Sequence, residues 1–170
     1  GGGLDNIWKY LYMGVNRTNY VIDNVRKMLP AAKTPESLAN LEAVIGEARL
    51  LRGMCYFRLI AMYGDVPYIG NIVYDNSEVA SISRTPIAEV KDSIYADFTY
   101  AAEKLPSKAS AIGRAAKPAA LAFRGKLNLY WACWNKFGWP ELDTFTPSES
   151  EAEAAYAAAA NDFRSVIDDF

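Results

Sequence analysis

Apolar residues recur at intervals of three and four along most of this chain, and that spacing constrains the fold more than any other feature. It predicts helices over residues 4–29, 35–63, 85–105 and 118–136, and from residue 148 onward. Pro30 and Gly64 follow two of these segments, and Thr34-Pro35 begins another as an N-cap and first-turn pair. Little of the chain alternates as strands do, so we expect an all-α fold.

The second and fourth segments indicate how the helices pack. The second carries the cleanest apolar stripe, which we expect to be its buried face: Leu41, Val44, Ala48, Leu51, Cys55, Leu59 and Met62. The fourth is apolar on both sides, which is typical of a central helix with two neighbours. Short connections predict two antiparallel hairpins, one from the first two helices and one from the last two. Ser148 and Glu151 predict a capping box at the start of the fifth helix.

Composition narrows the function classes. The chain has no histidine, the commonest general base and metal ligand, so we expect no catalytic triad, metal site or cofactor. A net charge of −2 argues against nucleic acid as the main partner, because phosphate binding needs a basic face. No apolar run approaches the roughly 20 residues that span a bilayer. We expect Cys55 and Cys133 to be small buried residues, with a disulfide between them as the minor alternative.

Four stretches, in order along the chain, carry a resemblance to a known family. Residues 47–59 read Glu-Ala-Arg-Leu-Leu-Arg-Gly-Met-Cys-Tyr-Phe-Arg-Leu, and residues 63–67 read Tyr-Gly-Asp-Val-Pro. The first helix holds Trp8, Tyr12, Asn16, Asn19 and Ile22; the third begins at Arg84-Thr85-Pro86; residues 113–120 read Gly-Arg-Ala-Ala-Lys-Pro-Ala-Ala. Together these stretches resemble the SusD/RagB family of nutrient-binding lipoproteins, with Gly53 standing where that family usually has alanine.

The resemblance implies a fold, a location and partners. The fold is all-α, with tetratricopeptide-like helical hairpins packed as a right-handed superhelical bundle. The location is the outer face of the outer membrane, reached through a lipid anchor whose cysteine this chain lacks. The ligand is an oligosaccharide or, less often, a peptide, and the partner is a TonB-dependent SusC-like transporter. We therefore expect residues 1–170 to be a single helical domain, the N-terminal part of a longer protein that catalyses nothing.

Sugar binding requires a flat aromatic surface and planar polar groups, and the chain offers candidates for both. The ligand-binding residues that we expect are Trp139, Tyr74, Tyr12, Asn16 and Asn71. Trp139 follows Gly138 in a loop and is the aromatic residue that helix packing explains least. Tyr12 and Asn16 lie one turn apart and either form part of a cleft or meet a missing neighbour. Trp8 and Trp134 lie on apolar faces, where we expect them to pack in the core.

Two functions stay open at this point: a glycan-binding lipoprotein, and a helical-repeat scaffold that binds protein without a sugar site of its own. Convergence of Trp139, Tyr74 and Tyr12 on one concave surface favours the first, and their dispersal favours the second. We expect Glu47 and Arg52, with Arg49, to form an inter-helix charge network, because an unpaired buried charge is costly. No pair of acids is placed as glycoside cleavage requires, so an enzyme is not expected.

Overall fold

The computed structural model describes residues 2–139, 142 and 144–170 of the chain. Its α-helices are α1 (Gly2–Met28), α2 (Pro35–Tyr63), α3 (Ile87–Lys104), α4 (Lys117–Phe137) and α5 (Glu149–Asp169). Two short 3₁₀ turns, η1 (Leu29–Ala31) and η2 (Asn76–Glu78), lie in the connections. The described residues contain no strand beyond one isolated bridge between Val66 and Thr85, so the prediction of an all-α fold is confirmed.

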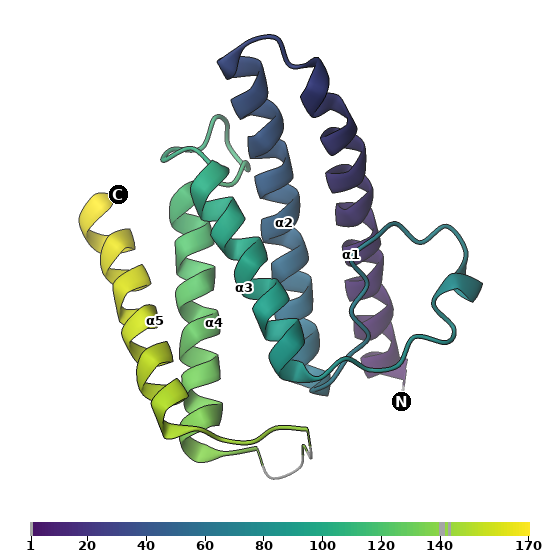
Figure 1. Ribbon diagram of the computed structural model, residues 1–170, viewed down its shortest axis with the longest axis vertical. Helices are drawn as coiled ribbons and strands as arrows, with labels where there is room; N and C mark the ends of the chain where they lie inside the picture. Colours follow the sequence, from purple (N-terminus) through teal and green to yellow (C-terminus); the bar gives the residue numbers. More distant parts are fainter. Residues whose placement is uncertain (1, 140–141, 143) are drawn as a thin grey trace.

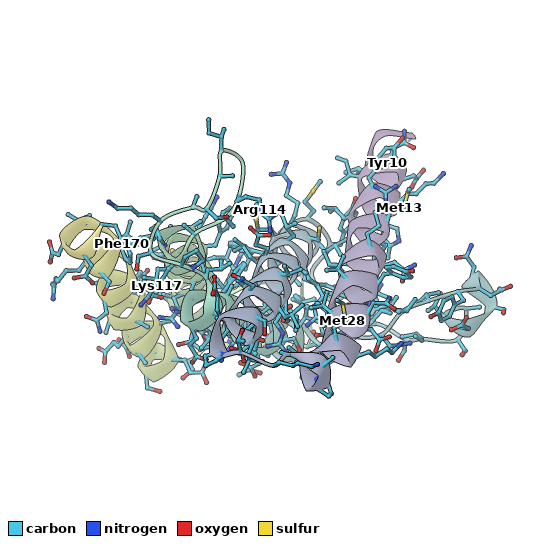
Figure 2. The ribbon with its side chains drawn as sticks, turned by 90° about the horizontal axis from the view of Figure 1, so that it is seen from above. Tyr10, Met13, Met28, Arg114, Lys117 and Phe170 are labelled. Carbon is cyan, nitrogen blue, oxygen red and sulfur yellow. The ribbon has the colours of Figure 1, made fainter. Side chains whose placement is uncertain are left out.

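The helices stand side by side in chain order, each packed on the next (Figure 1). Helices α1 and α2 form one antiparallel hairpin, and α4 and α5 form another, as the short connections predict. Helix α3 lies between the two hairpins, and α4 lies between α3 and α5, as its apolar character on both sides predicts. This arrangement is the tetratricopeptide-like one that the resemblance implies.

Local chemistry explains where the helices begin and end. The Thr34 hydroxyl accepts from the Ser37 amide at 3.1 Å, and Ser37 Oγ accepts from the Thr34 amide at 3.1 Å. Helix α2 therefore begins with a capping box. Gly64 ends α2 with a φ of +67°, a conformation that glycine adopts at little cost. The first free amide of α3, that of Ile87, donates to Asp65 Oδ1 at 2.8 Å.

The predicted capping box at the start of α5 is only half formed. Ser148 Oγ accepts from the Glu151 amide at 3.4 Å. The Glu151 carboxylate does not accept a hydrogen bond from the Ser148 amide, and instead accepts from the indole nitrogen of Trp131 at 3.0 Å. A charged hydrogen bond to a large neighbouring side chain has replaced the local one.

The predicted buried stripe of α2 is wrong at several positions. Leu51 is 52% exposed and Met62 is 38% exposed, whereas only Ala48 and Leu59 of the stripe are buried. The apolar residues that α2 buries are Ile45, Ala48, Leu50, Tyr56, Phe57, Leu59 and Ile60. The physical reason is that α2 packs on α1 along one side and on α3 along another. A helix with two buried faces has no single apolar stripe.

Neither cysteine is disulfide-bonded. Cys55 and Cys133 are free, as mainly expected, but half-buried where full burial was expected. None of the described helices has an apolar stretch long enough to cross a bilayer. Within the same residues, no three metal-ligating side chains come together in a cluster.

Candidate functional site

The connection between α2 and α3, residues 66–83, leaves the bundle and runs along the outer side of α1 (Figure 1). We call it the linker. Side chains of α1 bond to its backbone: the Tyr12 hydroxyl donates to the Pro67 carbonyl at 2.7 Å. The Asn16 side chain pairs with Val73 in both directions, donating to its carbonyl at 2.9 Å and accepting from its amide at 2.8 Å. Asn16 therefore binds Val73 as a neighbouring strand would.

A second pair of side chains fixes the linker closer to the core. The Asn19 amide donates to the carbonyls of Ile69 at 3.0 Å and Asn71 at 2.8 Å. The Tyr56 hydroxyl, on α2, accepts from the Ile69 amide at 2.7 Å and donates to the Ile69 carbonyl at 3.1 Å. Both side chains are buried, so water does not compete for these bonds. Residues 67–73 are thus fixed to two helices at once.

Burial keeps the two phenols of this region protonated. It raises the pKa of Tyr12 well above its ordinary value, although the positive charge of Arg84 acts in the opposite direction. Burial likewise raises the pKa of Tyr56. Both hydroxyls therefore remain hydrogen-bond donors at any physiological pH.

Asn19 is itself held by a buried ion pair. Asp97 of α3 accepts two bonds of 2.7 Å from the Arg52 guanidinium, one from Nε and one from Nη2. The remaining terminal nitrogen of Arg52 donates to Asn19 Oδ1 at 2.8 Å. The contacts Asp97–Arg52–Asn19–linker therefore cross the molecule from α3 through α2 and α1. The predicted charge network of α2 is confirmed, with Arg49 also 3.6 Å from Asp97 and Glu47 paired with Arg114.

A groove of about 550 Å³ lies between α1 and the linker. It is lined by Trp8, Lys9, Tyr12, Met13, Val15, Asn16, Pro67, Ile69, Val73, Asn76 and Val79. Its walls are mostly apolar, and three lining side chains, Trp8, Lys9 and Asn76, have polar atoms that make no hydrogen bond within the described residues. Volumes of this size hold small ligands in proteins. The groove can therefore offer one aromatic surface, an apolar wall and a few donors.

The structure separates the predicted ligand-binding residues. Tyr12 and Asn16 line the groove, but their polar atoms are occupied by the linker. Asn71 and Tyr74 lie on the linker without lining the groove, and the Tyr74 side chain is 79% exposed. Trp139 lies in the connection between α4 and α5, stacked on Trp134 at a ring distance of 4.0 Å. Of Trp139, Tyr74 and Tyr12, whose convergence would favour a glycan-binding protein, only Tyr12 lines the groove.

Trp8 combines two roles that the sequence suggested were alternatives. Its ring packs against the core, with Tyr12 at 4.9 Å and Tyr63 at 5.0 Å, and it also lines the groove. The Arg84 guanidinium lies 5.6 Å from the ring centre. Sequence reasoning missed Lys9 and Asn76; the one available signal was their position beside Trp8 and within the turn-forming residues of the linker.

Comparison with known proteins identifies the family. Residues 3–129 match the SusD-like family described as starch-binding and associating with the outer membrane, and the chain belongs to that family. SusD-like protein P2 of Formosa agariphila is 31% identical over 128 residues, which are 75% of this chain and 24% of that protein. The chain thus spans about a quarter of the length of that relative.

Two solved structures show the same fold and carry ligand names. One was determined with a xylogluco-oligosaccharide; it is 26% identical, with a TM-score of 0.76 over 99% of this chain and 30% of the other. The second is a laminarin-binding SusD-like protein that is 26% identical, with a TM-score of 0.64 over 88% of this chain and 28% of the other.

Proposed function

We propose that this protein captures oligosaccharides and binds them in the groove between α1 and the linker. The observation that carries the proposal is the groove itself, which combines the Trp8 ring with the unengaged polar ends of Lys9 and Asn76. An aromatic ring covers the apolar face of a sugar, and amide and ammonium groups bond its hydroxyls. The ligands named for the two structural relatives, a xylogluco-oligosaccharide and laminarin, support a glycan as the ligand class.

The family supports the wider proposal. As a member of a family described as associating with the outer membrane, the protein acts at the outer surface of that membrane, held by a lipid anchor. It passes captured oligosaccharide to a TonB-dependent SusC-like transporter and performs no catalysis itself. Residues 1–170 form one helical domain of the larger binding protein, and Asn71, Tyr74 and Trp139 remain candidates for contacts outside the groove.

A second candidate function is a helical scaffold that binds protein or peptide and has no sugar site of its own. The observation in its favour is that the polar atoms of Tyr12 and Asn16 are already bonded to the linker. Two of the predicted sugar contacts therefore stabilise the fold. The glycan proposal depends on the other side chains of the groove.

Titration calorimetry with xylogluco-oligosaccharides and laminarin oligosaccharides tests the proposal on the 170-residue chain. The informative variants are Lys9→Ala and Asn76→Ala, because the polar atoms of these side chains make no hydrogen bond within the described residues. The matched controls are Lys126→Ala on α4 and Asn161→Ala on α5, which are also exposed and lie outside the lining of the groove. Removing one hydrogen bond to a bound sugar weakens binding about tenfold.

The expected result is saturable binding of at least one glycan, weakened by the two groove variants and unchanged by the two controls. Binding that all four variants leave unchanged would place the sugar elsewhere. A folded chain that binds none of these glycans would favour the scaffold function.

A further inference from the structure

The buried contacts Asp97–Arg52–Asn19 end on the backbone of the linker, which forms one wall of the groove. We infer that Arg52 and Asn19 are positioning residues: they set the place of that wall, and through it the affinity for ligand, without touching ligand themselves. The second part of this inference rests on the proposed function, because it assumes that the groove is where ligand binds.

Arg52 fixes the direction in which the Asn19 side-chain amide faces. Its oxygen accepts from the Arg52 guanidinium at 2.8 Å, so its nitrogen faces the linker and donates to two carbonyls, those of Ile69 and Asn71. Turning the amide by half a rotation would put its N–H groups against the guanidinium and its oxygen against the two carbonyls. All of its contacts would then be repulsive, so Arg52 selects the orientation that binds the linker.

Asp97 in turn fixes the direction of the Arg52 guanidinium. Asp97 holds it by two parallel bonds of 2.7 Å, which fix its plane and aim the remaining terminal nitrogen at Asn19. All three side chains are buried, so their bonds are stronger and water does not compete for them. A lysine at position 52 could keep the charge but not this planar, three-way geometry.

Asn19 and Asn16 together hold the part of the linker that lines the groove. Ile69 and Asn71 accept from Asn19, and Val73, two residues further on, pairs with Asn16. Ile69 and Val73 line the groove, as does Asn76 beyond them. Tyr12 also bonds Pro67, and Tyr56 also bonds Ile69. Among the described residues, the helix side chain that bonds the Asn71 backbone is Asn19, so its loss would free the middle of this wall and shift Asn76 relative to Trp8.

The chain provides a matched control for the charge chemistry. Arg124 of α4 and Asp162 of α5 form a second half-buried ion pair, with Arg124 Nη2 2.6 Å and Nε 3.0 Å from the carboxylate. The other contacts of this pair, with Thr99 and Asn128, stay between helices. Arg124→Lys therefore makes the same chemical change as Arg52→Lys without a route to the linker.

The test measures two quantities on wild type, Arg52→Lys, Asn19→Asp and Arg124→Lys. The first is hydrogen exchange of the Ile69 and Val73 amides in the free protein. The second is affinity for a xylogluco-oligosaccharide by calorimetry. Asn19→Asp keeps the acceptor for Arg52 and removes both donors to the linker. We expect both linker variants to speed exchange at Ile69 and Val73 about tenfold and to weaken sugar binding by a similar factor, with Arg124→Lys changing neither.

The two measurements separate failure of the inference from failure of the proposed function. Unchanged exchange in Arg52→Lys and Asn19→Asp, with both proteins folded, would overturn the positioning role whether or not sugar binds. Faster exchange with unchanged sugar affinity would overturn the part that concerns ligand. If wild type binds no sugar, the proposed function fails while the exchange data alone still decide the positioning role. A Asn19→Asp protein that does not fold leaves Arg52→Lys, which retains the charge, as the deciding variant.

Discussion

The hairpins α1–α2 and α4–α5 are built alike and differ in what their polar side chains reach. Each contributes to an arginine–carboxylate pair: Arg52–Asp97 is buried between α2 and the neighbouring α3, and Arg124–Asp162 is half-buried between α4 and α5. Each also has an aromatic cluster, around Trp8 in the first hairpin and around Trp134 in the second. Among the described residues, the Arg124 pair bonds only to helix side chains, whereas the Arg52 pair extends through Asn19 to the linker.

This difference accounts for where the groove forms. Near α1, polar bonds hold an irregular segment at a distance from the helix, and a hollow remains between them. Near α4, Trp134 and Trp139 stack at 4.0 Å and fill the space with their own rings. The same kind of polar contact is therefore accompanied by a groove where it positions backbone outside the helices.

The largest expected effect comes from breaking the two ion pairs. Arg52→Ala removes both hydrogen bonds from the buried Asp97 carboxylate and leaves it only the more distant Arg49, 3.6 Å away, so we expect the free energy of unfolding to fall by about 3 kcal/mol. Arg124→Ala should cost less, about 1–3 kcal/mol, because that arginine is nearer the surface. Urea denaturation measures both. Equal costs for the two variants would contradict the difference in burial.

Alkaline pH should weaken the α1–linker region more than the α4–α5 region. Burial raises the folded-state pKa of Tyr12 and Tyr56, so folding favours their neutral forms. Their contribution is complete below the unfolded pKa of about 10 and is lost as pH rises above it, by up to about 1.4 kcal/mol per pH unit for each phenol. Burial raises the pKa of Tyr130 only to about 12, so its loss ends sooner.

Urea denaturation at pH 8 and at pH 11 tests this sign. Between these pH values each phenol loses about the same stability, so replacing Tyr12 and Tyr56 by phenylalanine together should remove about twice the alkaline loss that Tyr130→Phe removes. A stability that stays constant between the two pH values would mean that none of these phenols is held neutral by the fold.

Two glycines at helix contacts provide a smaller comparison. A Cβ added at Gly53 would lie 2.6 Å from the buried ring of Phe98, whereas one at Gly125 would lie 3.0 Å from the half-buried ring of Phe163. We expect Gly53→Ala to destabilise by about 1–2 kcal/mol despite alanine's higher helix propensity, and Gly125→Ala to be nearly neutral. Thermal unfolding of both variants checks the order. A more stable Gly53→Ala protein would show that the Phe98 ring can move aside.

The smallest effect is expected from Trp139→Ala. Loss of the stacked contact with Trp134 should cost about 0.5–1.5 kcal/mol. Its effect on glycan binding in the groove should be nil, because Trp139 does not line the groove. Calorimetry with a xylogluco-oligosaccharide measures this, with Trp134→Phe as a control for packing. Loss of binding in Trp139→Ala alone would restore Trp139 as a sugar contact.

Much of the fold could be predicted from local sequence, and the errors have one physical source. Proline, glycine and Thr34 act on their own neighbours, so the boundaries of α2 follow from sequence. The buried face of α2 does not, because Leu51 becomes exposed and Leu50 buried through the placement of two neighbouring helices. Glu151 likewise leaves its predicted local bond for Trp131, a residue 20 positions away.

The site was harder to predict than the fold. For Tyr12 and Asn16 the sequence left two alternatives open, a cleft or a neighbour, because the linker that they bond lies more than 50 residues away in sequence. Asn19 was noted only as a residue that resembles the family. No neighbouring residue indicates that its amide binds two carbonyls of the linker. Trp139 seemed free of helix contacts because its stacking partner belongs to the preceding helix and faces it only after the Gly138 turn, where φ is +81°.

The most direct test of the central claim uses the four tryptophans of the chain as reporters. Indole N–H resonances, assigned by single Trp→Phe variants, are followed by NMR while a xylogluco-oligosaccharide is added. We expect the Trp8 resonance to shift in a saturable way and those of Trp134 and Trp139 to stay in place. A saturable shift of Trp139 with Trp8 unmoved would contradict the account and place the sugar at the α4–α5 connection.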